Sequence, residues 1–149
     1  MTSAFIPTAA GLSRVDVADR ARSHVLDAHR GVVEAAVTAG AAAAADVPAP
    51  AERRVVETRL ELALREGDLP GRLVGVLRDT VDALGFDLAA EPVAAPPYVV
   101  ITARGPMLRA TVDAGRLVVL VRAFDRTAEG YVPASADPDG AVDVTFHRA

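Results

Sequence analysis

The 149-residue chain contains no cysteine, lysine, asparagine, glutamine or tryptophan. The absence of cysteine excludes disulfides, thiolate nucleophiles, zinc fingers and iron–sulfur clusters. The absence of lysine excludes a P-loop lysine and Schiff-base chemistry. The remaining residues form no recognised nucleophile–base pair, metal motif or cofactor motif. The sequence therefore predicts no catalytic residue, no cofactor and no metal site, and an enzyme is the least favoured class.

Alanine and valine dominate what is present, with 31 and 22 copies. All positive charges are arginine, and 16 arginines against 20 acidic residues give a net charge of −4. Arginine without lysine indicates a GC-rich genome, and the acidity would also suit a salty cytoplasm. No apolar run approaches the roughly 20 residues that a membrane span needs, and the N-terminus lacks a basic leader before an apolar stretch. We therefore expect a cytoplasmic protein.

The first 46 residues predict one long helix. Ser13 is a plausible N-cap, and Asp16 follows three residues later. Gly40 could end this helix, although the alanines after it could continue it to Asp46. A stripe of small residues follows one face at steps of three and four, namely Ala18, Ala21, Val25, Ala28 and Val32. This stripe would pack on the protein's own second helix or, alternatively, form the seam of a homodimer.

Two shorter helices are predicted after the linker at residues 47–51. One spans about Glu52 to Glu66 and stops at Gly67, and the other begins after Asp68, with Pro70 in its first turn. The proline-rich segment 89–97 then separates a helical half, about 12–88, from a strand-forming half, about 98–147. We expect both halves to form a single domain spanning 1–149.

Three strands are predicted at residues 98–104, 107–113 and 116–124, where β-branched residues alternate with a period of two. Two-residue turns at Arg104-Gly105 and Ala114-Gly115 would pair Ile101 with Leu108, and Leu108 with Val121. Both turns place the aliphatic residues on one face. A fourth strand could contain Val142, Val144 and Phe146. The predicted class is α+β, with about three helices before a three- or four-stranded antiparallel meander.

The block PPYVVITARGPMLRATVDAGRLVVLVRAF, after an acidic and alanine-rich helical half, resembles small uncharacterised proteins of halophilic archaea. The similarity covers about a fifth of the chain directly. No activity is assigned to that family, so the resemblance implies no functional residue.

Histidines and acidic residues give no metal motif. His24 and His29 are five residues apart and would diverge by about 140° around one helix, whereas a helical zinc pair needs a spacing of four. We therefore expect solvated or partly packed histidines. The segment Asp137–Asp143 lacks the ligand pattern of an EF-hand and predicts a plain turn.

Arginines in the strand-forming half are the candidate binding residues. Segment 92–126 carries five arginines and two acidic residues, in contrast to the rest of the chain. Arg104, Arg109 and Arg122 could contact anions or nucleic acid, because the guanidinium group matches phosphate and carboxylate. Only Tyr98 and Phe124 could add stacking on the same face. The alternative is a solvated face or pairing with acidic residues of the helices.

The favoured function is a small non-enzymatic interaction or regulatory protein with an unidentified protein partner. A nucleic-acid or phosphate-binding module using the arginine face is the alternative. Nucleic acid is the less favoured partner, because the whole chain is acidic and offers few aromatic residues.

Overall fold

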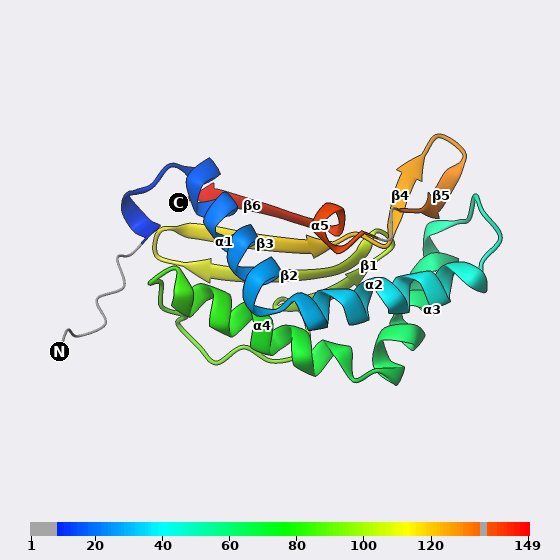
Figure 1. The fold of residues 1–149 in the computed structure, drawn as a ribbon, viewed down its shortest axis with the longest axis horizontal. Helices are drawn as coiled ribbons and strands as arrows, with labels where there is room; N and C mark the ends of the chain where they lie inside the picture. The colour runs from blue at the N-terminus through cyan, green and yellow to red at the C-terminus, as the bar shows by residue number, and fades with distance from the viewer. Residues whose placement is uncertain (1–8, 135–136) are drawn as a thin grey trace.

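The computed structural model describes residues 9–134 and 137–149. The expectation that the N-terminus carries no secretory leader concerns residues that lie mostly outside these ranges. A short 3₁₀ turn, η1 (Ala9–Gly11), precedes four helices: α1 (Arg14–Ala28), α2 (Arg30–Ala45), α3 (Arg53–Glu66) and α4 (Leu69–Ala83). The strands are β1 (Val99–Thr102), β2 (Gly105–Val112), β3 (Gly115–Val121), β4 (Phe124–Thr127), β5 (Gly130–Pro133) and β6 (Val142–Arg148), with a short helix, α5 (Pro138–Ala141), before the last. The predicted α+β class is confirmed (Figure 1).

The predicted long first helix is wrong, because the chain breaks at His29. Ser13 caps α1 as expected, and its hydroxyl accepts a hydrogen bond from the Asp16 N–H at 3.1 Å. At His29 the backbone leaves helical values, with φ −127° and ψ 26°, and α2 begins one residue later. A straight helix over both segments would be about 48 Å long, roughly twice the length of the sheet strands. The break keeps both halves against the core.

Gly40 does not end the helix, which continues to Ala45. The glycine is needed where α2 crosses the end of the sheet. A Cβ atom at position 40 would lie 2.7 Å from the Cβ of Ala123, which is closer than real Cβ contacts allow. A residue that would weaken an isolated helix is therefore used here for a close contact.

Helices α3 and α4 correspond to the two shorter helices that the sequence predicts, and they form a hairpin. Val56, Leu60 and Leu64 of α3 are buried, and Gly67 is its C-cap. Asp68 takes the N-cap position of α4 but adopts a left-handed conformation, and its side chain makes no capping hydrogen bond. After α4 the Phe86 N–H donates to the Val81 carbonyl at 3.1 Å, so the helix ends in a Schellman motif.

The main sheet is antiparallel with strand order β1-β2-β3-β6, so the fourth strand forms and pairs with β3. The predicted registers are each wrong by two residues. Leu108 pairs with Val99 and Val119 rather than with Ile101 and Val121. A shift of two residues preserves the faces, because side chains alternate with a period of two.

The register follows from two glycines that begin strands instead of occupying turns. Gly105 has a φ of +148°, and a Cβ there would lie 1.9 Å from the Val121 carbonyl oxygen. Gly115 has a φ of +154°, and a Cβ there would lie 2.2 Å from the His147 carbonyl oxygen. Only glycine allows the neighbouring backbone to pass this closely.

A second hairpin, β4–β5, follows β3 and was not predicted. Strand β3 ends at Val121, so Phe124 belongs to β4 rather than to the third strand. Tyr131 of β5 exchanges two backbone hydrogen bonds with Ala51, at 2.9 and 2.8 Å, and this ties the hairpin to the α2–α3 connection.

The core lies between the helices and the inner face of the sheet. Helix α1 packs along β6, and α4 packs on β2 and β1 (Figure 1). Leu108, Leu117 and Val119 are each no more than 1% exposed, which confirms the predicted aliphatic face. No helix within residues 9–134 and 137–149 is long and apolar enough to cross a lipid bilayer.

Val119→Asp should lower the free energy of unfolding by about 3 kcal/mol or more, because it buries an unpaired charge. Val118→Asp is the matched control, since Val118 lies on the opposite face and is half-buried. The control should cost less than half as much. Urea unfolding of both variants measures the difference, and equal costs would contradict the face assignment.

Gly40→Ala should destabilise the protein although alanine is the better helix former. The clash with Ala123 should cost about 1–3 kcal/mol, which exceeds the roughly 1 kcal/mol gained in helix propensity. Gly75→Ala in α4 is the control, because a Cβ at position 75 meets nothing within 4 Å. Thermal melts should shift in opposite directions for the two variants, and a stabilised Gly40→Ala would contradict the close contact.

Candidate functional site

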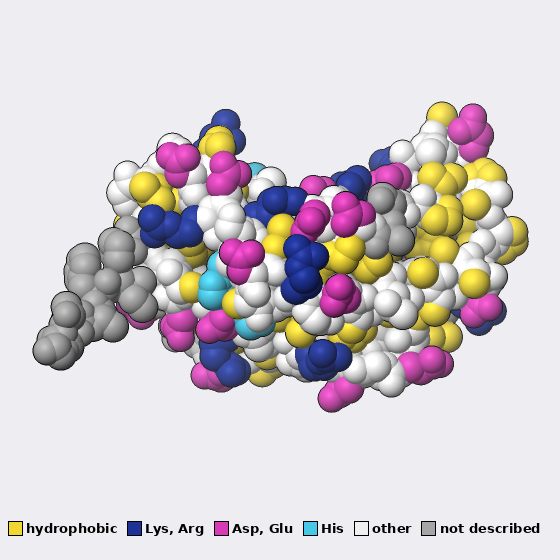
Figure 2. All heavy atoms as spheres, in the orientation of Figure 1, with side chains coloured by type: hydrophobic (Ala, Val, Ile, Leu, Met, Phe, Trp, Pro, Cys, Tyr) yellow, Lys and Arg dark blue, Asp and Glu magenta, His cyan; other side chains and the backbone are white. Residues whose placement is uncertain are grey.

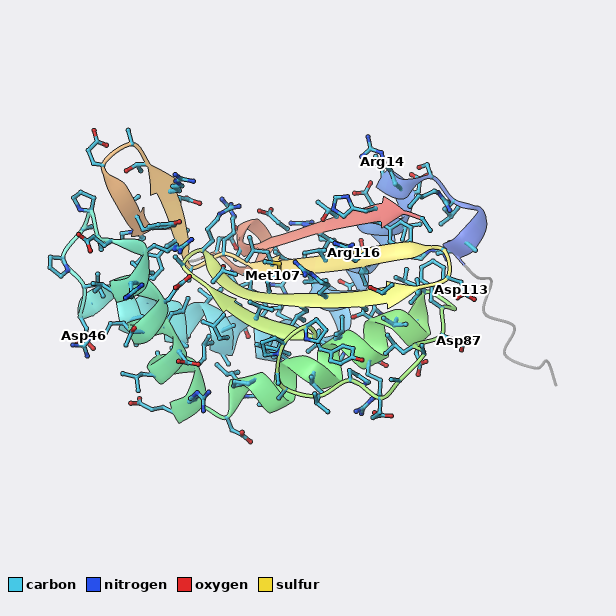
Figure 3. The ribbon with its side chains drawn as sticks, turned by 180° about the vertical axis from the view of Figure 1, so that it is seen from behind. Arg14, Asp46, Asp87, Met107, Asp113 and Arg116 are labelled. Carbon is cyan, nitrogen blue, oxygen red and sulfur yellow. The ribbon has the colours of Figure 1, made fainter. Side chains whose placement is uncertain are left out.

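The outer face of the sheet is not covered by any described helix. Figure 3 shows β2, β3 and β6 from this side, with Met107 and Arg116 labelled on the strands. The register places on this face the half-buried residues Val100, Met107, Arg109, Val118 and Leu120 and the exposed residues Thr111, Arg116, Asp143, Thr145 and His147. The face is therefore an apolar strip with charged borders.

Two of the three candidate arginines lie together at one end of this face. The Nη1 atom of Arg122 lies 3.2 Å from Asp125, and its Nη2 donates to the Gly140 carbonyl at 2.6 Å. Its Nε lies 3.3 Å from Asp143, within ion-pair distance but without hydrogen-bond geometry. Arg104 lies 4.0 Å from the same carboxylate. Both guanidinium groups are thus partly neutralised by nearby acids.

The third candidate, Arg109, lies in a different environment. Arg109 lies on β2. On one side its backbone N–H donates to the Tyr98 carbonyl at 2.9 Å, and on the other side it pairs with Val118 of β3. The Arg109 Nε is buried and has no hydrogen-bond partner among the described residues. Beside it is a hollow of about 250 Å³, lined by Tyr98, Thr111 and Leu88 among others. The structure therefore does not group Arg109 with Arg104 and Arg122.

A second cluster joins three helices through two histidines and an aspartate. His24 lies on α1, His29 lies at the α1–α2 break and Asp79 lies on α4. The Nε2 atoms of His24 and His29 lie 2.8 and 2.7 Å from the same Asp79 oxygen, Oδ2. The expected divergence of 140° is wrong, because the chain is not helical at His29. Figure 2 shows histidine side chains at the surface over the end of α1.

The electrostatics of this cluster follow from its hydrogen bonds. An ionised carboxylate only accepts, so both imidazoles donate an Nε2–H to Asp79. The bonds from His24 and His29 lower the pKa of the Asp79 carboxyl, while desolvation acts in the opposite direction. The side chains of His24 and His29 are 26% and 20% exposed, and that of Asp79 is 52% exposed. The rings are held in place, and the carboxylate reaches solvent.

These three side chains can also serve as metal ligands. One ligand atom from each lies within 4.8 Å of the other two, in the only such group of three among the residues described. Two imidazoles and a carboxylate are a donor set used by zinc and by non-haem iron. The sequence carried no signal for the site, because Asp79 is 50 residues from His29 and the break at His29 has no strong motif.

The segment Asp137–Asp143 forms a short capped helix and the start of β6. Asp137 accepts a hydrogen bond from the Asp139 N–H at 3.2 Å. Asp139 pairs with Arg30, and Asp143 pairs with Arg122. These carboxylates point to arginine partners on separate elements rather than toward a common centre.

The small-residue stripe is largely covered by the protein's own chain. Ala21 and Val25 are buried, Ala18 and Val32 are half-buried, and Ala28 is exposed. Helix α1 packs on β6 and α4 as well as on α2. A homodimer through this stripe stays a prediction, and a second copy would meet mainly Ala28 and the exposed parts of Ala18 and Val32.

The chain belongs to a family described as a domain of unknown function, DUF7988, whose model matches residues 19–147. The match includes α1 from Asp19 onward and the main sheet up to His147 of β6. It also includes the three candidate arginines and the cluster of His24, His29 and Asp79. Searches of curated proteins and of solved structures found no match.

Asp79→Asn should lower the free energy of unfolding at pH 7 by less than about 1 kcal/mol, because half of the side chain is exposed. The folded-state pKa of Asp79 is lowered, so its contribution is complete above the unfolded value of about 3.9. This contribution is lost as the pH falls through the folded-state pKa. Urea unfolding of the wild type and of Asp79→Asn at pH 7 and pH 3 measures this contribution. If the two proteins differ in free energy of unfolding by the same amount at both pH values, the hydrogen bonds from His24 and His29 to Asp79 are contradicted.

Proposed function

We propose that this protein is a non-enzymatic interaction module whose outer sheet face binds an acidic surface of a partner protein. The observation that carries the proposal is Arg109, whose buried Nε has no hydrogen-bond partner among the described residues, on a face that no described helix covers. Because the Nε itself is buried, a carboxylate of a second molecule would reach the guanidinium group from the solvent-exposed part of this half-buried side chain, and the charge-assisted hydrogen bond would favour binding.

The apolar strip beside Arg109 supports protein binding. Val100, Met107, Val118 and Leu120 are half-buried in the isolated chain, and together they form the centre of the outer face. An apolar centre with an arginine anchor and a polar border is typical of protein interfaces. The second face of an antiparallel sheet is often polar and solvated, so this strip is unusual.

The charge of the face supports an acidic partner. Among the residues that the register places on this face, Arg109 and Arg116 are positively charged and Asp143 is negatively charged, although the whole chain has a net charge of −4. Electrostatic complementarity would steer an acidic surface toward this face. The cytoplasm remains our proposed compartment. In a cytoplasm of high salt, as the resemblance to proteins of halophilic archaea implies, salt would screen the charges of the outer face and of its partner. The apolar strip would then contribute more of the binding free energy.

The alternative ligand is single-stranded nucleic acid or another phosphate. The same Arg109 could bind it, but Arg104 and Arg122 already lie beside Asp143. Three free arginines would give a log–log salt slope of about −2 on a single strand, whereas a single free arginine would give a slope of only about −0.7. The geometry therefore favours a protein partner over a phosphate ligand.

Site-specific photocrosslinking in the native cell tests the proposal. A crosslinking residue at Thr111, on the outer face, should capture one acidic protein, whereas the same residue at Thr58 on α3 should not. Both positions are exposed. The purified partner should then bind about tenfold more weakly to Arg109→Ala, the equivalent of about 1.4 kcal/mol, and normally to Arg72→Ala.

Three results would contradict the proposal. Capture at Thr111 that persists in Arg109→Ala would show that the arginine is not the anchor. Capture of a second copy of the chain would indicate a homodimer instead. Binding of labelled single-stranded DNA at low salt that Arg109→Ala abolishes, without any captured protein, would favour the nucleic-acid alternative.

A further inference from the structure

The convergence of His24, His29 and Asp79 brings three potential metal ligands to one point. Three separate positions, on α1, at the α1–α2 break and on α4, direct ligand atoms at one point. The two rings approach edge to face with centroids 5.5 Å apart, and both aim Nε2 at the same Oδ2.

Uncharged imidazole and ionised carboxylate are the forms that bind transition metals. The Asp79 Oδ2 atom lies 2.8 and 2.7 Å from the two Nε2 atoms, so a carboxylate oxygen is already placed between the two rings. Each imidazole would bind through Nε2 as the Nδ1–H tautomer, so the ring proton that Nε2 now donates to Asp79 would move to Nδ1. Thiolate is absent from the chain, so the ligands available here are nitrogen and oxygen.

We propose that His24, His29 and Asp79 form a mononuclear site for a divalent transition metal of the zinc class. The metal would be bound by the two Nε2 atoms and one Asp79 carboxylate oxygen. Three protein ligands leave at least one coordination position open. Because the Asp79 side chain is 52% exposed, that position would reach solvent and could take water or an anionic group.

The adjustment needed to admit a metal is small. The ligand atoms of a tetrahedral zinc site lie about 3.3 Å apart, as bond lengths of about 2.0–2.1 Å require. The Asp79 oxygen now lies 2.8 and 2.7 Å from the two nitrogens, so it would move outward by about half an ångström or slightly more. The exposure of the Asp79 side chain leaves room for this movement.

The site would also fix the relative positions of the helices. His29 lies where the backbone departs from helical geometry, and the metal would tie this break to α4. Because binding to the folded state alone stabilises that state, the midpoint of thermal unfolding should rise with metal concentration. This property distinguishes a formed site from loose association with surface carboxylates.

Titration of metal-free, tag-free protein with Zn²⁺ by calorimetry tests the proposal. We expect one ion per chain, with a dissociation constant of about 1 μM or lower and an affinity of about −8 kcal/mol. His24→Ala, His29→Ala and Asp79→Asn should each weaken binding at least tenfold. His147→Ala is the matched control, since His147 is exposed on β6 outside the cluster, and it should bind Zn²⁺ like the wild type.

Spectroscopy and stability provide independent readouts. Co²⁺ should give visible d–d bands of a four- or five-coordinate site, and these bands should disappear on addition of Zn²⁺ and in Asp79→Asn. Circular dichroism without metal shows whether each variant is folded, so a misfolded variant is replaced by His24→Gln or His29→Gln. Arg109→Ala should bind Zn²⁺ normally, which separates this site from the proposed protein interface.

The proposal is overturned if the folded wild type binds no Zn²⁺ at 100 μM metal, about a hundred times the expected dissociation constant. It is also overturned if the three single variants bind as the wild type does, or if His147→Ala loses binding as they do. In those cases the cluster is a hydrogen-bonded contact between α1, α2 and α4, and any bound ion is adventitious.

Discussion

Burial of the inner sheet face is the contact on which the rest of the structure depends. Leu108, Leu117 and Val119 lie on adjacent strands and are almost fully covered. The chain has few aromatic residues, at 4%, so many small aliphatic contacts must supply the apolar area instead. Alanine-rich helices can approach closely enough to do this, and Gly40 against Ala123 is the tightest example described above. Overpacking at such points is as costly as a cavity.

Covering that face explains the break in the first helix. Helix α1 follows β6, and α2 turns away to reach α3, α5 and β5. Arginines secure the same region, since Arg22 donates to the carbonyl groups of Asp139 and Val142, and Arg30 pairs with the Asp139 carboxylate. The geometry at His29 that follows from this path also places its ring beside His24 and Asp79. A packing requirement thus creates a cluster with its own chemistry.

The two faces of the sheet differ because helices cover only one of them. The outer face keeps an apolar strip and the Nε of Arg109, which has no hydrogen-bond partner within the described ranges. The histidine cluster lies on α1, at the α1–α2 break and on α4, which belong to the helices that pack against the inner face. A protein partner on the outer face would therefore leave a metal at the cluster accessible, and the two proposals can be tested separately.

The α+β class, the Ser13 cap, the two helices after residue 51 and the inner face of the sheet could be predicted from the sequence, because they depend on local periodicity and capping chemistry. The sequence-based prediction missed both strand registers by two residues, since a shift of two keeps the same face and only close backbone contacts at Gly105 and Gly115 select between them. The arginines were identifiable as a group, but their ion pairs depend on Asp143, which lies on a distant strand. Only the tertiary structure brought His24, His29 and Asp79 together, because a helix break and a separate helix decide their distances, and no local pattern encodes them.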